Sequence, residues 1–384
     1  MRLFDWLRGA DRKVRVERKF LAFGVGAPVW PCRDPTAFAR EGYARNAVAY
    51  RCVRLIAEAA ASAPLRVTPE DHPLAELLRR PNPEQTGVEL LEAFFGHLQV
   101  SGNAFLEASA FEDEPPREIF VLRPDRMRVI AGGNGWPIGW EYRAGSVVRR
   151  FDRDPISEHA PILHLKLFHP TDDWLGLSPM EAAAYAIDIH NAGGAWNKAL
   201  IDNAARPSGA LVFSGVGGAD RLSEEQFQRL KAELEEAHMG AANAGRPLLL
   251  EGGLDWKPMS LTPADMDFIE ARHAAAREIA LAFGAPPMLL GIPGDNTYSN
   301  YREANLAFWR QTALPLAMKA ARAIETWLGD RWGGETARVS LDLESVPALA
   351  SEREAQNGEL WSRLSGADFL TDAEKRRLAG VETP

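Results

Sequence analysis

Cysteine is scarce in this sequence of 384 residues, which contains only Cys32 and Cys52. Two thiols are too few for a disulfide framework, and they lack the spacing of metal ligands, so we expect both to stay reduced in a cytoplasmic protein. The sequence also lacks an apolar run of about 18 residues, the length that a transmembrane helix needs. The apolar stretch within residues 1–8 is too short for a signal peptide, and we interpret it as a tail or docking arm rather than a membrane-surface segment.

Positive charge is not in excess either, since the formal net charge is -9. A conventional DNA-binding protein would carry a basic patch and a high isoelectric point, so the balance argues against that class. It does not exclude a protein through which DNA passes without being gripped. Hydrophobic content of 46% and charged content of 25% are ordinary for a folded chain, and the length predicts one elongated multi-part fold or two to three domains.

Known catalytic motifs are missing: there is no Gly-x-Ser-x-Gly elbow, Walker loop, HExxH or Cys-x-x-Cys. His159, His164 and His169 recur at intervals of five, which would place them on alternate faces of a strand and argues against a shared metal. Asp172 and Asp173 are a conceivable cation site, but their neighbours favour a loop. We therefore predict no catalytic residue, no metal and no cofactor. A metal-dependent nucleic-acid-processing enzyme built on these two aspartates is the alternative.

The first half of the chain predicts an α/β unit. After an irregular segment over residues 1–45, Asn46 is a helix N-cap, and the helix that follows should end before Pro64. Two further helices are expected, one stopped by Pro81 and one over about residues 87–100. Alternating apolar residues over 104–169 predict strands in one largely antiparallel sheet.

Long helices dominate the second half. Ser178 caps a helix that reaches about Ala205, with Gly193 and Gly194 in its middle. Because each helix-interior glycine costs about 1 kcal/mol, this pattern predicts close helix–helix packing. A small α/β insert is expected over 206–260, with strands at 210–213 and 247–251 and a helix capped by Ser223 and Gln226.

A second helix should run from Thr262 to Gly284, where a glycine ends it. The longest helical pattern extends over about residues 300–329 and contains Pro315, which should kink or break it. The pairs Ser351/Glu354 and Thr371/Glu374 predict short helices near the end. The fold class is therefore α+β.

Eight segments, in this order along about residues 45–380, resemble the HK97-type portal protein family of bacteriophages, which includes the portals of gene transfer agents. They are 77–86 (LLRRPNPEQT), 101–105 (SGNAF), 122–126 (LRPDR), 176–179 (GLSP), 245–253 (GRPLLLEGG), 265–272 (DMDFIEAR), 279–287 (IALAFGAPP) and 298–300 (YSN). A motif of the family near the C-terminus is matched only in part, by 370–376 (LTDAEKR).

The resemblance implies a portal fold with named parts. These would be an N-terminal arm (1–45), an α/β wing (46–177), a two-helix stem (178–205 and 261–290), a small α/β clip (206–260), a tunnel loop (291–300), a long kinked wing helix with a return strand (301–349) and a short helical crown (350–384). The helix with Gly193, Gly194 and Trp196 would pack against neighbouring subunits of a ring.

The same resemblance implies a non-enzymatic subunit of a dodecameric ring at one capsid vertex of a virion or gene transfer agent particle, assembled in the bacterial cytoplasm. Double-stranded DNA would pass through its channel during packaging and ejection. The large terminase, a head-tail adaptor and the major capsid protein would be its partners. The tunnel loop nearest the DNA would include Asp295, Asn296, Thr297, Tyr298, Ser299 and Asn300. A scaffold or adaptor subunit of another large assembly fits the missing catalysis but not the motif order.

Overall fold

The computed structural model describes residues 35–111, 114–133, 136–154, 159–202, 209–213, 254–258, 268–293 and 298–350, with residues 225, 228–229, 232, 358–359, 361–364, 366, 371 and 374–375. All of these belong to one compact unit, Cys32–Pro384. The cap expected at Ser223 and Gln226, the strand expected at 247–251 and the pair Ser351/Glu354 lie outside the described residues. So does Cys32.

The first described elements are helical turns that lead into a capped helix. Helix α1 (Pro35–Ala37) and the π-helical turn η1 (Phe38–Tyr43) precede α2 (Ala47–Ser62). The irregular structure predicted for residues 35–43 is therefore wrong, because burial of Phe38 beside Met180 holds these turns in the core. Asn46 caps α2 as predicted, and its Oδ1 accepts the backbone N–H groups of Val48 and Ala49.

Helices α3 (Pro73–Arg79) and α4 (Gly87–Ser101) follow the short strand β1 (Leu65–Thr68). Thr86 and Glu89 form a reciprocal capping box at the start of α4. The helix ends at Gly102, whose φ of 73° is the left-handed conformation that glycine adopts without strain. The two helices thus begin and end where the local sequence predicts.

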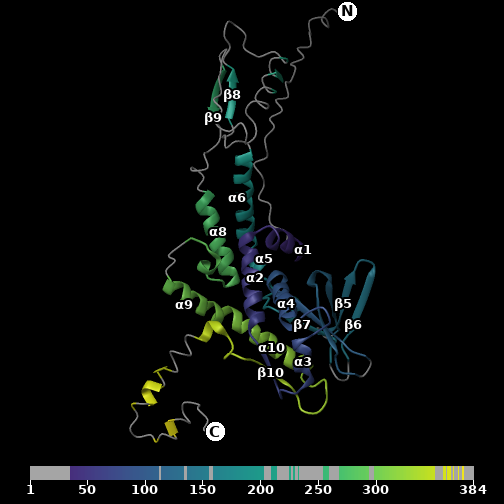
Figure 1. Ribbon diagram of the computed structural model, residues 1–384. Coiled ribbons are helices and arrows are strands. Elements are labelled where there is room, and N and C mark those ends of the chain that lie inside the picture. The colour runs from purple at the N-terminus through teal and green to yellow at the C-terminus, as the bar shows by residue number, and fades with distance from the viewer. Residues whose placement is uncertain are drawn as a thin grey trace, which may run out of the picture. The chain divides into compact units, whose positions relative to one another are not determined.

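Six strands form two separate three-stranded antiparallel sheets (Figure 1). In one, β2 (Asn103–Ser109) lies between β3 (Glu118–Leu122) and β7 (Ile162–Lys166). In the other, β5 (Pro137–Ala144) lies between β4 (Met127–Ala131) and β6 (Val147–Asp152). The antiparallel prediction is confirmed, but the single sheet is wrong. The chain leaves the first sheet through the 3₁₀ turn η2 (Pro124–Arg126), where proline has no N–H to continue a ladder.

The helix capped by Ser178 is divided into α5 (Pro179–Ala182) and α6 (Ala184–Asp202). Strand β8 (Gly209–Phe213), which the sequence predicted, pairs with β9 (Leu254–Pro258), which it did not. Helix α8 (Phe268–Phe283) ends at Gly284, with φ 68°, as predicted. A 3₁₀ turn, η4 (Pro287–Leu290), follows it.

The long helix predicted around Pro315 is interrupted by a π-helical turn. Figure 1 shows α9 (Tyr298–Phe308) continuing into α10 (Leu314–Leu328), and the turn η5 (Trp309–Ala313) separates them. Pro315 is the second residue of α10, where its missing N–H costs no intrahelical hydrogen bond. The interruption expected at this proline is therefore present as a π-helical turn just before it, and α9 and α10 remain continuous. After α10, β10 (Arg338–Leu341) pairs with β1, and a 3₁₀ turn, η6, spans Pro347–Leu349.

Two large apolar clusters hold these elements together. One contains Phe94, Phe95 and Leu98 of α4 with Ile324 and Leu328 of α10. The other joins α2 to α5, α6 and α8, with these buried side chains among its members: Cys52, Ile56, Met180, Ile187 and Ile279. Trp309 packs against both clusters from the π-helical turn.

Burial also affects the free cysteine of α2. It raises the pKa of the Cys52 thiol to about 12, so this free cysteine stays protonated at neutral pH, in accord with a reduced thiol.

Near the end of the chain, Thr371 and Glu374 exchange the backbone and side-chain hydrogen bonds predicted for a capping pair. Within the described part of the chain, no helix combines the length and apolar character needed to cross a membrane.

Candidate functional site

Helices α6 and α8 lie side by side (Figure 1). Gly193 is buried, and a Cβ atom there would lie 2.9 Å from Cγ of Arg272 in α8. Within one chain, this glycine therefore makes room for Arg272. A Cβ at Gly194 would meet no atom within 4 Å, so the described residues of the same chain do not require that glycine.

Helix α6 also presents large apolar side chains to the surface. Tyr185, Ile189 and Trp196 are 46%, 52% and 43% exposed. Their spacing of four and seven residues places them on one face of the helix. Leu281 of α8 is exposed to 80%. Soluble chains seldom leave such a face open, so it is a candidate contact surface.

A polar network fixes the middle of α6 to the start of α2. The amide nitrogen of Asn46 lies 3.0 Å from Oδ1 of Asn191 and 3.2 Å from Nδ1 of His190. Asn191 in turn donates to the backbone oxygen of Glu41 in η1 at 3.0 Å. Burial lowers the pKa of His190, and the nearby Arg272 lowers it further. A neutral His190 can accept the Asn46 hydrogen bond, so the network is complete at neutral pH.

The segment expected to be a loop over 291–300 is partly helical. Gly291 has φ 72°, Ile292 is buried, and the backbone oxygen of Pro293 accepts a hydrogen bond from Arg277 at 2.7 Å. Asp295, Asn296 and Thr297 lie outside the described residues. Tyr298, Ser299 and Asn300 are the first turn of α9, which corrects their prediction as loop residues.

The histidines and aspartates considered for metal binding are held apart. Only His164 lies in a strand, so the expected alternation of three histidines along one strand is wrong, because β7 is five residues long. His164 lies 3.0 Å from Asn103 Oδ1, and His159 lies 3.5 Å from Asp330. Among the described residues, no group of three or more His, Cys, Asp or Glu is placed to hold a metal ion.

Asp172 has a structural task. Its Oδ1 accepts the backbone N–H groups of Trp174 and Leu175 at 2.7 and 2.9 Å. These hydrogen bonds lower the pKa of Asp172 and order the loop, as expected from its neighbours. One carboxylate oxygen is therefore committed to the backbone, which accounts for Asp172 as a loop residue.

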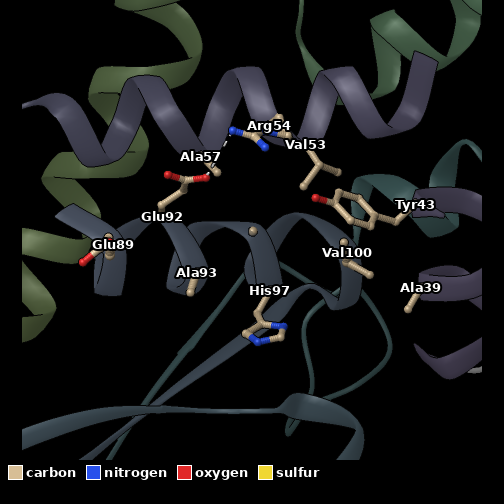
Figure 2. A pocket seen from close by; sticks show the side chains of 11 residues that line it. Ala39, Tyr43, Val53, Arg54, Ala57, Glu89, Glu92, Ala93, His97 and Val100 are labelled. Atoms are coloured by element: carbon tan, nitrogen blue, oxygen red, sulfur yellow. Dashed lines mark ion pairs between the residues drawn. The ribbon is translucent and has the colours of Figure 1, made fainter. Parts of the chain in front are cut away.

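A cavity of about 460 Å³ lies between η1, α2 and α4 (Figure 2). Its acidic lining is engaged, since Glu89 belongs to the capping box and Glu92 lies 3.7 Å from Arg54 across the two helices. His97 points away from α2, and burial lowers its pKa. The described lining thus offers no paired acid and base for catalysis.

Two of the motifs quoted above meet in space although they are 73 residues apart. The Asn103 side chain accepts the N–H of Gly176 at 2.8 Å and donates to its carbonyl oxygen at 3.3 Å. A Cβ at Gly102 would lie 2.3 Å from the Gly176 oxygen, so only glycine fits there. These residues fasten the segment before α5 to the sheet, which is a role in positioning.

The family model for the phage portal protein matches residues 47–380. This chain belongs to the phage portal protein family. The match spans every helix and strand from α2 to β10, so the portal fold accounts for the mixed helix and sheet architecture. The resemblance found in the eight short segments is thereby confirmed.

Relatives of this portal-family chain support the membership. It is 42% identical to an uncharacterized protein of Rickettsia bellii, over 89% of this chain and 88% of the relative. It is 28% identical to the portal protein of Enterobacteria phage HK97, over 73% of this chain and 66% of the relative.

Solved structures agree. A chain from the neck of a native gene transfer agent particle, computed with C12 symmetry, is 52% identical, with a TM-score of 0.71 over 94% of this chain and 97% of that one. An HK97-family phage portal protein from Corynebacterium diphtheriae is 16% identical, with a TM-score of 0.58 over 83% of this chain and all of that one. The second likeness shows a shared fold.

The sequence missed the residues that hold α2, α6 and η1 together. Asn191 and His190 had no local signal, because their partner Asn46 is 144 to 145 residues away. The exposed face of α6 could have been found, since Tyr185, Ile189 and Trp196 recur at helical spacing among small and polar residues.

Proposed function

We propose that this chain is the subunit of a twelve-membered portal ring in the neck of a gene transfer agent or phage particle, and that double-stranded DNA passes through the ring. The observation that carries the proposal is the 52% identical chain in a gene transfer agent neck of C12 symmetry, which corresponds to nearly the whole length of this one. A portal subunit of this kind acts by assembly and not by catalysis.

Ring closure needs two different surfaces on each copy, because a cyclic interface joins one face to another. The open face of α6, formed by Tyr185, Ile189 and Trp196, supplies one apolar surface. A Cβ at Gly194 would meet no described atom of its own chain within 4 Å, so a neighbouring helix could approach its backbone closely. We therefore assign α6 and α8 to a stem that packs around the ring.

The segment before α9 is proposed to face the DNA as a tunnel loop. Phosphate neutralisation by lysine and arginine dominates DNA affinity, and a ring repeats each channel-facing charge in every subunit. The segment before α9 contains Asp295, Asn296 and Thr297, and the first turn of α9 adds Tyr298, Ser299 and Asn300, so this stretch has one acid and no base. A loop of this composition would let DNA slide.

The remaining parts follow from the portal fold. Residues 46–177 and 301–349 would form the wing, 206–260 the clip and 350–384 the crown. We propose that the clip docks the large terminase during packaging and a head-tail adaptor afterwards, and that the major capsid protein surrounds the ring at one vertex. Assembly would take place in the bacterial cytoplasm.

The ring is tested by light scattering coupled to size exclusion. Twelve copies of the 42.3 kDa chain have a mass of about 510 kDa. Trp196→Asp should reduce the assembled fraction strongly, whereas Trp361→Asp, a similarly exposed tryptophan outside α6, should not. A monomer or dimer with divalent-metal nuclease activity would refute the proposal.

The channel is tested in particles. Asn296→Lys should slow packaging and shorten the packaged DNA, because twelve added cations would hold the phosphates. Ser340→Lys adds the same charge at an exposed position of β10 and is the matched control. Unchanged packaged length in Asn296→Lys particles would rule out DNA contact at this loop.

A further inference from the structure

A second cavity, of about 1010 Å³, lies between β5, β7 and α10. Neither the ring nor the channel proposal uses it. Four tryptophans contribute to its lining: Trp136, Trp140, Trp174 and Trp327. Trp136 is 72% exposed. Tryptophans that line a hollow are typical anchors for a protein partner, because they bury large area with little loss of conformational freedom.

Trp140 carries a buried hydrogen-bond donor that is not used. The residue is 3% exposed, and its indole Nε1 has no acceptor in the described part of the chain. Trp327, on the opposite wall, donates its own Nε1 to the backbone oxygen of Ala160 at 2.8 Å. Buried polar groups in native proteins nearly always have partners, so the Trp140 donor is open to an acceptor that the described residues do not supply.

The cavity also has cations without carboxylate partners. The Arg153 guanidinium lies 5.9 Å from the Trp140 ring centroid, and Arg153 is an exposed residue. Lys166 of the lining donates to the backbone oxygen of Asp173, and Lys319, which lies outside the lining, donates to the backbone oxygen of Lys166 at 2.5 Å. None of the three forms an ion pair with an acid in the described part of the chain. Burial lowers the pKa of Lys319, and Lys166 lowers it further, as expected for two cations that share one region.

The other ionisable residues of the cavity lining limit the negative charge that a bound partner can carry. Asp173 and Asp330 also face the cavity. His164 contributes no positive charge, because burial and Lys166 lower its pKa to about 3. A polyphosphate would be repelled by the two aspartates, whereas one carboxylate among apolar groups fits. The lining therefore favours an acidic peptide over a nucleic acid.

We propose that this cavity docks a segment of a separate protein, which places one Asp or Glu side chain at Trp140 and Arg153 and sets apolar side chains against the tryptophans. The exposed Arg153 side chain can shift from the Trp140 ring and let the carboxylate reach Nε1. A carboxylate there accepts hydrogen bonds from the indole and the guanidinium, and both are strengthened by charge. The site is independent of ring stoichiometry and of DNA contact.

The test begins with a surface-displayed library of random 12-residue peptides, selected on the purified full-length chain. Enriched peptides are synthesised with a fluorescent label, each beside a copy in which Glu or Asp is replaced by the amide, and binding is measured by anisotropy. We expect the enriched peptides to share an acid flanked by aromatic or aliphatic residues. The amide copy should bind at least tenfold more weakly.

Two variants and two controls locate the binding site. Trp140→Phe removes the N–H and keeps an aromatic ring, and Arg153→Gln removes the cation from an exposed position; each should weaken binding at least tenfold. Arg150→Gln, whose parent guanidinium is already paired with Asp152 at 2.7 Å, and Trp361→Phe should leave binding unchanged. Because Arg153 is exposed, its variant tests the site even if Trp140→Phe folds poorly.

Several results would overturn the proposal. The proposal fails if no selected peptide family depends on Trp140 or Arg153 for binding. It also fails if the acid and amide copies of a peptide bind with equal affinity, or if the peptides bind the site variants as tightly as the control variants. Displacement of the peptide by inorganic phosphate or by a 20-residue oligothymidylate would assign the cavity to a phosphate group and would equally reject the peptide.

Discussion

Arg272 of α8 lies against the backbone of Gly193 in α6, so close that a Cβ at position 193 would be 2.9 Å from its Cγ. Gly193→Ala should therefore strain the helix pair, although alanine favours helix formation by about 1 kcal/mol. We expect a net loss of about 1 to 2 kcal/mol of unfolding free energy, because overpacking in a tight contact outweighs the propensity gain. Denaturant titration measures it.

The neighbouring glycine is the matched control. Gly194→Ala meets no atom within 4 Å in the same chain and should stabilise the isolated subunit by about 0.5 to 1 kcal/mol. If α6 packs around a ring, the same change should lower the assembled fraction. Equal effects of the two alanines on the subunit would contradict the helix–helix contact described here.

Asn46 should contribute more to the free energy of unfolding than an ordinary helix cap does. Asn46→Ala removes two capping hydrogen bonds and leaves Asn191 and His190 without their donor, so we expect a loss of about 2 to 4 kcal/mol. Thr86→Ala removes the exposed cap of α4 and should cost about 1 kcal/mol. Chemical unfolding of both variants compares them directly, and equal losses would show that the long-range network contributes nothing.

Arg149 is predicted to join the two three-stranded sheets. It pairs at 2.5 Å with Glu107, whose side chain is 9% exposed, while Arg149 itself is 54% exposed. Arg149→Met should cost about 1 to 3 kcal/mol, because it leaves a buried carboxylate without its cation. Arg150→Met, which breaks the exposed pair with Asp152, should cost at most about 1 kcal/mol. Similar thermal shifts for both variants would contradict this role.

His164 should make the protein sensitive to acid. Its pKa of about 3 in the folded chain lies below the ordinary value of 6.5, so the unfolded chain binds more protons between these values. The stability contributed by neutral His164 is complete above about pH 6.5 and is lost as pH falls toward 3. Between pH 7 and 4.5, His164→Gln should lose about 2 to 3 kcal/mol less stability than the parent, measured by urea unfolding. Equal losses would place the acid sensitivity elsewhere.

Signals confined to a few residues predicted the fold well. Asn46, Ser178 and the pair Thr371/Glu374 cap helices as expected, because each cap and its backbone partner are within four residues. Gly284 ends α8 for the same local reason. Strands β2 to β7 were placed in the right region because alternating burial leaves a pattern in sequence.

The sequence predictions that failed concern features that depend on residues far apart in the chain. Alternation of apolar residues indicates that β5 is a strand, but it shows neither that Ile138 is exposed nor that β4 and β6, rather than β7, are the neighbours of β5. Strand β9 alternates apolar Leu254 and Trp256 with charged residues, but it is short and has its partner about 45 residues earlier. Residues 35–43 form helical turns because Phe38 is buried in the same apolar cluster as Met180. No local sequence pattern shows that burial. At the candidate site, the motif order indicated the family, while contacts such as Asn46 with Asn191 required the fold.

The π-helical turn at Trp309–Ala313 gives the long helix one residue more than regular winding would need. Deletion of a single residue there would restore an unbroken spiral and rotate everything on one side by about 100°. Trp309 would then leave one of the two clusters that it touches. The extra residue thus rotates α10 relative to α9 about the helix axis. One continuous helix can therefore contribute apolar side chains to two cores that lie at different angles around it.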